Sequence, residues 1–146
     1  MTQRKTFQPQ TCYVSIEDLV PQEHFLRKLA SEIDFSFIYD ETKELHRQNP
    51  TIPEIDPVVV VKFLLIGYLY NLESERRIEQ EIQVNMAFRW FLGLNIKDKV
   101  PAYDAITQNR RIEHNGKRVY TKLFERVLAK CIEKGFVDIK TLARSS

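Results

Sequence analysis

The chain has 146 residues, with 22 Lys and Arg against 20 Asp and Glu, for a formal net charge of +2. This length suits one compact domain that buries a core without disulfide or metal support. The two cysteines, Cys12 and Cys131, are far apart in the sequence and outside any CxxC or Cys/His cluster, so the sequence supports neither a disulfide framework nor a zinc site.

The first residues and the longest apolar segment argue against export and membrane insertion. Residues 1–6 are polar and lack the apolar run of a signal peptide. The apolar segment 57–72 is interrupted by Lys62 and falls short of the ~20 residues that a membrane-spanning helix needs. We therefore expect a soluble, cytoplasmic protein with no membrane partner.

Charge is distributed unevenly between the two halves of the chain. Residues 1–71 carry 7 Lys and Arg against 10 Asp and Glu, a net −3, whereas residues 72–146 carry 15 against 10, a net +5. The basic half is the candidate surface for an anionic partner such as nucleic acid. An imbalance of this size is also common on solvated helices, so charge alone does not decide the function.

The first third of the chain predicts an arm followed by two helices. Residues 1–19 show no sustained period and are expected to be extended. From Pro21, apolar residues recur at helical spacing as far as Ile33, which predicts a helix of about three turns. The spacing across residues 35–47 predicts a second helix, ended by the proline-containing connector 49–55.

The central segment predicts a helix that is buried on several sides. Asp56 is suited to the N-cap and Pro57 to the first helical position. The segment from there to about Asn71 is apolar nearly all round, which is typical of a central helix. The β-branched run 58–61 also fits a buried strand, but the length and the cap favour a helix.

Two short helices are expected next. Ser74 is suited to cap the first, which should break at Asn85, and the second should cover residues 86–92 and end at Gly93. We assign Trp90 and the neighbouring phenylalanines to the core rather than to base stacking.

The last part of the chain predicts two more helices and the start of a strand. Asp104 is suited to the N-cap of a helix from Ala105 to about Glu113, ended by Asn115-Gly116. A continuous apolar stripe from Tyr120 to Ile132 predicts a long helix that stops at Gly135. Residues 136–142 resemble the beginning of a strand.

Taken in order, these segments resemble the amino-terminal region of bacterial insertion-sequence transposases, in which a helical DNA-binding domain precedes an RNase H-like DDE catalytic core. The similarity is carried by Leu19-Val-Pro21, Ile33-Asp-Phe-Ser-Phe-Ile-Tyr39, Pro57 to Asn71, Ser74-Glu-Arg-Arg77, Phe88-Arg-Trp-Phe-Leu-Gly-Leu94 and Gln108-Asn-Arg-Arg111. The resemblance and the periodicity together predict an all-α fold. We expect a compact multi-helix domain over residues 1–142, with a helix-turn-helix-like DNA-binding unit, an extended N-terminal arm, a short C-terminal strand start and a tail at 143–146.

Two departures from the family pattern bear on function. Relatives usually have Pro-Asp-His-Ser-Thr before the arginine-bearing helix, where this chain has Pro101-Ala-Tyr-Asp-Ala105. We expect Asp104 to preserve the N-cap of that helix, while the contacts of the histidine and of the hydroxyl groups are lost. Glu133 to Asp138 corresponds to the segment that leads into the first catalytic strand. We therefore do not expect Asp138 to be the metal-binding aspartate.

Catalysis by this chain is not expected. A DDE core holds two divalent metals about 4 Å apart with three carboxylates. The eleven residues that follow Gly135 are too few to build such a sheet. We expect no catalytic residue, metal ligand or cofactor, and we assign surface or capping roles to the scattered histidines His24, His46 and His114.

The helix after Asp104 is the candidate recognition helix. Thr107, Gln108 and Arg111 are expected to point outward from it, and glutamine and arginine can read adenine and guanine edges bidentately in the major groove. The alternative is a solvated amphipathic helix. Cations around this helix are candidates for phosphate contacts: Lys97, Lys99, Arg110, Lys117 and Arg118.

Arg76 and Arg77 are a weaker candidate for phosphate contact. Glutamates surround them in the sequence, so we favour pairing within their own helix.

The expected partner is double-stranded DNA, namely the terminal inverted repeats of an insertion sequence. A homodimer that bridges the two ends of the element remains an open alternative. A second interpretation is a regulatory module that pairs with full-length transposase through the stripe from Tyr120 to Ile132. A third is a non-functional remnant.

Overall fold

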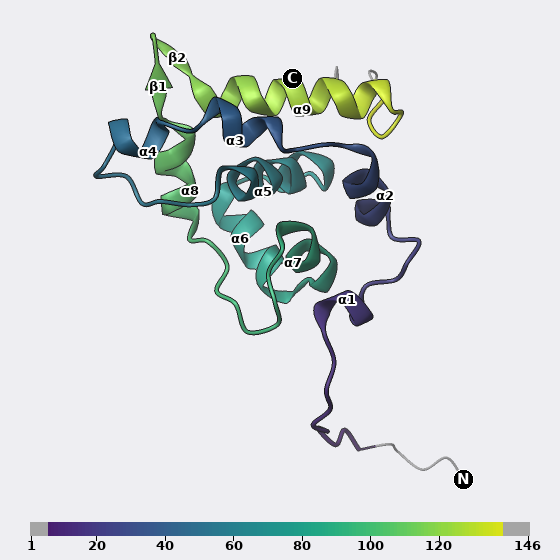
Figure 1. Ribbon diagram of the computed structural model, residues 1–146. Helices are drawn as coiled ribbons and strands as arrows, with labels where there is room; N and C mark the ends of the chain where they lie inside the picture. The colour runs from purple at the N-terminus through teal and green to yellow at the C-terminus, as the bar shows by residue number, and fades with distance from the viewer. Residues whose placement is uncertain (1–5, 139–146) are drawn as a thin grey trace.

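The computed structural model describes residues 6–138, which fold almost entirely into helices (Figure 1). The helices are α1 Ile16–Leu19, α2 Phe25–Glu32, α3 Phe37–Glu41, α4 Leu45–Gln48, α5 Pro57–Leu69, α6 Glu75–Val84, α7 Met86–Leu92, α8 Tyr103–Arg110 and α9 Val119–Glu133. Two short antiparallel strands, β1 Glu113–His114 and β2 Lys117–Arg118, lie between α8 and α9. The prediction of an all-α fold is confirmed.

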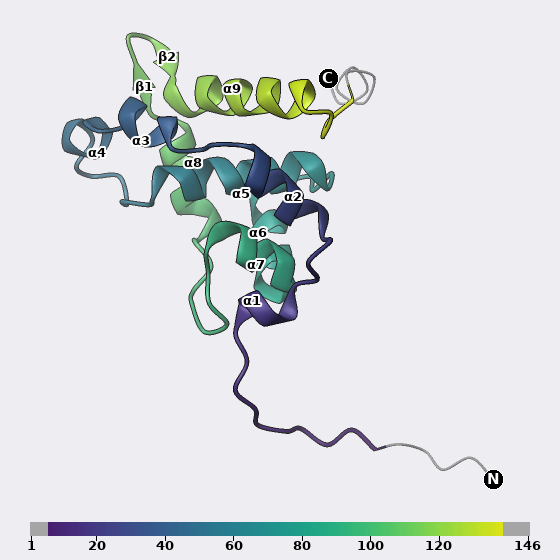
Figure 2. The ribbon, with the colours of Figure 1, turned by 45° about the vertical axis from the view of Figure 1, so that its right-hand side comes forward.

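Helix α5 forms the centre of the core. Asp56 caps it by accepting a hydrogen bond from the Val58 amide at 2.9 Å, and Pro57 occupies the first position. Val60 and Phe63 are fully buried. Helices α3, α6, α7 and α9 all pack on α5, with α9 on one side and α6 and α7 on the other (Figures 1 and 2). The all-round apolar character of this segment therefore predicted its central place correctly.

Helices α6 and α7 begin and end at the predicted caps. The Ser74 side chain accepts from the Arg77 amide at 3.1 Å. Asn85 ends α6 and caps α7, since its side chain accepts from the Phe88 amide at 3.0 Å. Gly93 ends α7 with φ at 78°, a conformation that glycine adopts without a steric cost.

The N-terminal arm is shorter than predicted. Residues 6–14 have no regular secondary structure, but Ser15 and Asp18 form a capping box with two hydrogen bonds of 3.2 Å, so the helical turn α1 follows. Ile16 is buried. The indole of Trp90 donates to the Glu17 carboxylate at 2.5 Å, which ties α1 to α7.

Two helix predictions in the first third need correction. The first helix begins at Phe25 and not at Pro21, because the His24 ring caps it by accepting from the Leu26 amide at 3.0 Å. The single helix predicted across 35–47 is interrupted at the buried Thr42. The hydroxyl of Thr42 donates to the Ile38 carbonyl at 2.7 Å, and the chain then turns into α4.

The region of the candidate recognition helix also differs from the prediction. Helix α8 begins at Tyr103 after Ala102, so Asp104 is not the N-cap. Glu79 of α6 accepts the Tyr103 amide at 2.8 Å and takes over the capping role. The helix stops at Arg110, and Asn115-Gly116 forms a hairpin turn, with φ of 54° and 74°, in place of a helix end.

Helix α9 and its stop agree with the prediction. Tyr120, Leu123, Val127 and Cys131 are buried against the rest of the domain, and Gly135 has φ of 81°.

The predicted strand does not form at residues 136–138, and residues 139–142 and the tail lie outside the described residues. Among residues 6–138, no helix combines the length and the apolar character that crossing a membrane requires.

Candidate nucleic-acid interface

Buried side chains fix the rotation of α8 on the domain. Ile106 is fully buried and Ile112, just beyond the helix, nearly so. Asn109 is also fully buried, and its side-chain amide donates to the carbonyls of Pro53 and Ala105, each at 2.9 Å. Because these residues point inward, the opposite face of α8 is held toward solvent.

A carboxylate of α6 holds two of the predicted DNA-binding residues. Glu75 accepts a hydrogen bond from the Thr107 hydroxyl and forms an ion pair with Arg110. Its side chain is 17% exposed and that of Arg110 is 30% exposed. The prediction that Thr107 points freely outward is wrong, because both Thr107 and Arg110 are turned toward α6. Glu75 was not predicted as a site residue.

The outward face of α8 presents Asp104, Gln108 and Arg111. These residues are spaced by four and three positions, which places them on one side of a helix, and all three are exposed. The outward orientation predicted for Gln108 and Arg111 is therefore confirmed. Both side chains are available to a ligand that approaches this face.

Exposed lysines and an arginine flank α8 at both of its ends. Lys97 and Lys99 lie in the loop that enters the helix, and Lys117 and Arg118 lie on β2, which follows it. The loop, α8 and the hairpin succeed one another along one edge of the molecule (Figures 1 and 2). None of the ion pairs within residues 6–138 involves these four residues or Arg111.

The lysine-bearing loop is organised by a buried arginine that the sequence did not indicate. Arg89 of α7 is 5% exposed. Its guanidinium donates to the carbonyls of Gln83 at 3.2 Å, Asn95 at 3.1 Å and Asp98 at 2.9 Å. The Asp98 carboxylate in turn accepts the Asn95 amide at 2.7 Å. The backbone that carries Lys97 and Lys99 is thus held by fixed hydrogen bonds.

Arg76 and Arg77 are engaged within the domain. Arg77 pairs with Glu81 at 3.0 Å, one turn along α6, as we preferred from the sequence. Arg76 donates instead to the Tyr103 hydroxyl at 2.8 Å, and its guanidinium lies 4.9 Å from the centre of that ring. These contacts join α6 to the first turn of α8.

The model of the family described as transposase domain (DUF772) matches residues 14–111. The chain belongs to this transposase-domain family. The match runs from the residue before the α1 cap to Arg111, and the hairpin and α9 lie beyond it. No curated protein and no solved structure matches the chain. The family resemblance inferred from the sequence is confirmed.

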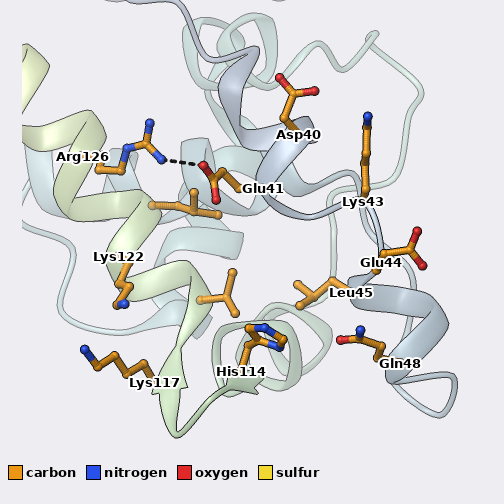
Figure 3. A pocket seen from close by; sticks show the side chains of 12 residues that line it. Asp40, Glu41, Lys43, Glu44, Leu45, Gln48, His114, Lys117, Lys122 and Arg126 are labelled. Carbon is orange, nitrogen blue, oxygen red and sulfur yellow. Dashed lines mark hydrogen bonds and ion pairs between the residues drawn. The ribbon is translucent and has the colours of Figure 1, made fainter.

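A groove of about 490 Å³ lies between α3–α4, which are part of the matched domain, and the hairpin with α9, which follow it (Figure 3). Asp40, Glu41 and Glu44 lie on its α3–α4 side. Lys117, Lys122 and Arg126 lie on the other side, and Arg126 pairs with Glu41 at 3.1 Å. Lys43 also lies on the α3–α4 side, so carboxylates and cations are interleaved around this groove, and one of the cations is already paired. The cations that flank α8 take part in none of the ion pairs within residues 6–138, so the α8 edge suits a polyanion better.

The three histidines of the chain have different environments. His24 caps α2, and His114 is exposed on β1, in line with the roles expected for them. His46 is half-buried on α4, and neither of its ring nitrogens has a hydrogen-bond partner within residues 6–138. The surface or capping role predicted for His46 is therefore wrong. No group of three or more His, Cys, Asp or Glu residues that could hold a metal occurs in residues 6–138.

Proposed function

We propose that this transposase domain binds double-stranded DNA through α8, and that its target is the terminal inverted repeat of an insertion sequence. Gln108 and Arg111 are assigned to base edges in the major groove. One observation carries the proposal: the outward face of α8 lies between two pairs of cations on one edge of the molecule.

The dimensions of this edge support the assignment. An α-helix with its side chains is about 10–12 Å across, and the major groove of B-DNA is about 12 Å wide, so the outward face of α8 can enter it. Cations before and after the helix then stand near the phosphates that border the groove. We assign Lys97 and Lys99 to the phosphates on one side of the groove, and Lys117 and Arg118 to those on the other side.

The packing of α6 across α8 supports a helix-turn-helix-like arrangement. In such units one helix braces the recognition helix while the latter enters the major groove. Here Glu75 and Glu79 of α6 bond to three residues of α8. We assign Thr107 and Arg110 to positioning α8, in place of the direct DNA contacts expected from the sequence.

The proposal gives this domain a recognition role and assigns it no catalytic residue and no cofactor. We do not propose the regulatory interpretation through the α9 stripe, because Tyr120, Leu123, Val127 and Cys131 are buried inside the domain. These side chains are therefore not offered to a full-length transposase.

The test is equilibrium binding to two labelled duplexes, one carrying the terminal repeat and one with the same bases in scrambled order. Arg111→Ala should lose about 1–3 kcal/mol on the repeat and little on the scrambled duplex, because a base contact carries sequence choice. Lys117→Ala should weaken both equally and reduce the salt slope by about 1. Lys28→Ala, an exposed cation on α2, is the matched control.

Two results would overturn the proposal. The first is a domain that binds neither duplex at low salt. The second is an Arg111→Ala variant whose binding to both duplexes equals that of Lys28→Ala, because that result would place the DNA on another surface.

A further inference from the structure

The N-terminal arm, residues 6–14, exposes aromatic side chains without any charged residue among them. Phe7 is 85% exposed and Tyr13 is fully exposed. The arm leads away from the body of the domain in both views (Figures 1 and 2). Phe7 and Tyr13 are the most exposed large apolar side chains of residues 6–138.

The root of the arm is firmly attached. The capping box at Ser15 sets the direction in which the chain enters α1. Arg27 pairs with Glu17 at 2.6 Å and stacks on the ring of Trp90 with its guanidinium carbon 4.6 Å from the ring centre. Because this anchor directs the arm away from its own domain, Phe7 is left exposed to solvent.

A small hollow lined by apolar and aromatic side chains lies on the body of the domain. Residues of α5, α8 and α9 line an open hollow of about 250 Å³: Leu64, Arg110, Tyr120, Thr121 and Phe124. An apolar cavity of about 150 Å³ is enough to bind benzene, so one phenyl ring fits this hollow. A second hollow of about 470 Å³ shares Leu64 and Arg110 with it and so adjoins it.

The charge of the hollow also suits an uncharged aromatic group. Arg110 is the charged residue of its lining, and Glu75 already neutralises it. The face of a guanidinium attracts the face of an aromatic ring. Phe124 makes an edge contact with Tyr68, with ring centres 5.9 Å apart, and a further ring can extend this arrangement.

We propose that the arm of one copy docks into this hollow of a second copy, with the Phe7 ring inserted beside Leu64 and Phe124. The rest of the arm, which carries no charged side chain, then lies along the adjoining hollow. Exchange of both arms about a two-fold axis makes the contact self-complementary, which limits the assembly to a dimer.

The proposal does not depend on DNA binding, so its test uses DNA-free protein. Sedimentation velocity over a concentration series compares three proteins: the wild type, an arm variant that carries both Phe7→Ser and Tyr13→Ser, and the hollow variant Thr121→Arg. Thr121 is exposed at the hollow, so a long charged side chain there blocks entry without disturbing the core. Ala129→Arg places the same charge at an exposed position of α9 outside the hollow lining and is the matched control.

We expect the wild type and Ala129→Arg to dimerise alike, and each of the other two variants to dissociate at least about tenfold more readily, as loss of an aromatic anchor does. An equimolar mixture of the arm variant and the hollow variant should regain association, because one supplies an intact hollow and the other an intact arm. A monomeric wild type, an arm variant that dimerises normally, or a mixture that stays monomeric would overturn the proposal.

Discussion

Glu75 of α6 and Arg110 of α8 form an ion pair that is largely shielded from solvent, and the same carboxylate accepts the hydroxyl of Thr107. The pair joins residues 35 positions apart in the sequence, and it adds to the contacts that Glu79 and Arg76 of α6 make with Tyr103 of α8. The contact fixes which face of α8 is turned outward. It also withholds one cation from any DNA that approaches the helix.

Substitution of Glu75 by Gln should strengthen non-specific duplex binding. The change removes a negative charge beside α8 and releases Arg110, so we expect a several-fold gain in affinity and a salt slope steeper by about 1. The free energy of unfolding should fall by about 1 kcal/mol, because the ion pair is partly solvated. Titration of a labelled duplex at several salt concentrations and urea denaturation measure the two effects.

Glu73→Gln is the control for that experiment, since Glu73 is an exposed carboxylate close by in the sequence. It removes the same charge without releasing Arg110. Equal gains in affinity for the two variants would show that Arg110 plays no part, and a loss of affinity in Glu75→Gln would contradict the prediction.

Arg89 should be essential to the order of the loop that carries Lys97 and Lys99. Substitution by Met leaves several backbone carbonyls without their donor, and we expect a loss of about 3 kcal/mol of stability. Arg89→Lys keeps the charge but not the planar fork, so it should recover only part of the loss. Hydrogen exchange should show faster exchange of the amides of residues 94–99 in both variants, and unchanged exchange there would refute the role.

The parts of the fold that the sequence predicted are those determined by local chemistry. Asp56-Pro57, Ser74 and Gly93 act through neighbours within a few residues, so their caps and stops could be recognised directly. The apolar stripe of α9 predicted a helix without knowledge of the segments that it packs against, because the period of the stripe matches that of a helix.

The parts that were missed depend on contacts between distant segments or on weak local signals. The periodicity of α8 placed Thr107 on an outer face, but it carried no information about Glu75, which lies 32 residues away. The hairpin has only two residues in each strand, too few for an alternating pattern, so Asn115-Gly116 resembled a helix stop. Arg89 gave no signal of its burial, because buried arginines are rare and no local pattern marks them.

Gly67 should be required for the close approach of α5 to α6. A Cβ at this position would lie 2.4 Å from the Ile78 Cδ1 atom and 3.1 Å from its Cγ1 atom. Alanine favours a helix by about 1 kcal/mol over glycine, but we expect the steric conflict to exceed this gain and Gly67→Ala to be destabilising.

A double-mutant cycle with Ile78→Val tests the cause of that loss. Valine lacks the Cδ1 atom, so the two substitutions together should be less harmful than the sum of their separate effects, by about 1 kcal/mol. Urea denaturation of the four proteins gives the coupling energy. Strict additivity would mean that the Cβ introduced by Gly67→Ala finds room elsewhere, contrary to the prediction.

Tyr120 carries a buried hydroxyl that has no hydrogen-bond partner within residues 6–138. Tyr120→Phe should therefore raise the free energy of unfolding by about 1 kcal/mol, since an unpaired buried polar group is costly. Burial, with a smaller contribution from Asp56, raises the pKa of Tyr120 well above its ordinary value of 10.0.

The raised pKa also predicts a pH dependence. Above pH 10.0 the unfolded chain loses this proton while the folded domain keeps it, so deprotonation favours the unfolded state and the free energy of unfolding falls as pH rises beyond that value. Tyr120→Phe should flatten the alkaline decline measured by urea denaturation. Tyr13→Phe, at a fully exposed position, is the control, and an equal response of the two variants would contradict the assignment.

The two cysteines should react with a thiol reagent at very different rates. Cys12 is exposed in the arm, whereas Cys131 is buried on the inner face of α9 and burial raises the pKa of its thiol to about 11. In dilute native protein near pH 8 we expect one thiol to react rapidly and the other only at the rate at which the domain opens, because the thiolate is the reactive form. Denaturant should expose both. Cys12→Ser should remove the rapid phase and leave the slow one, and a rapid reaction of Cys131 in that variant would mean that α9 does not pack on the core as described.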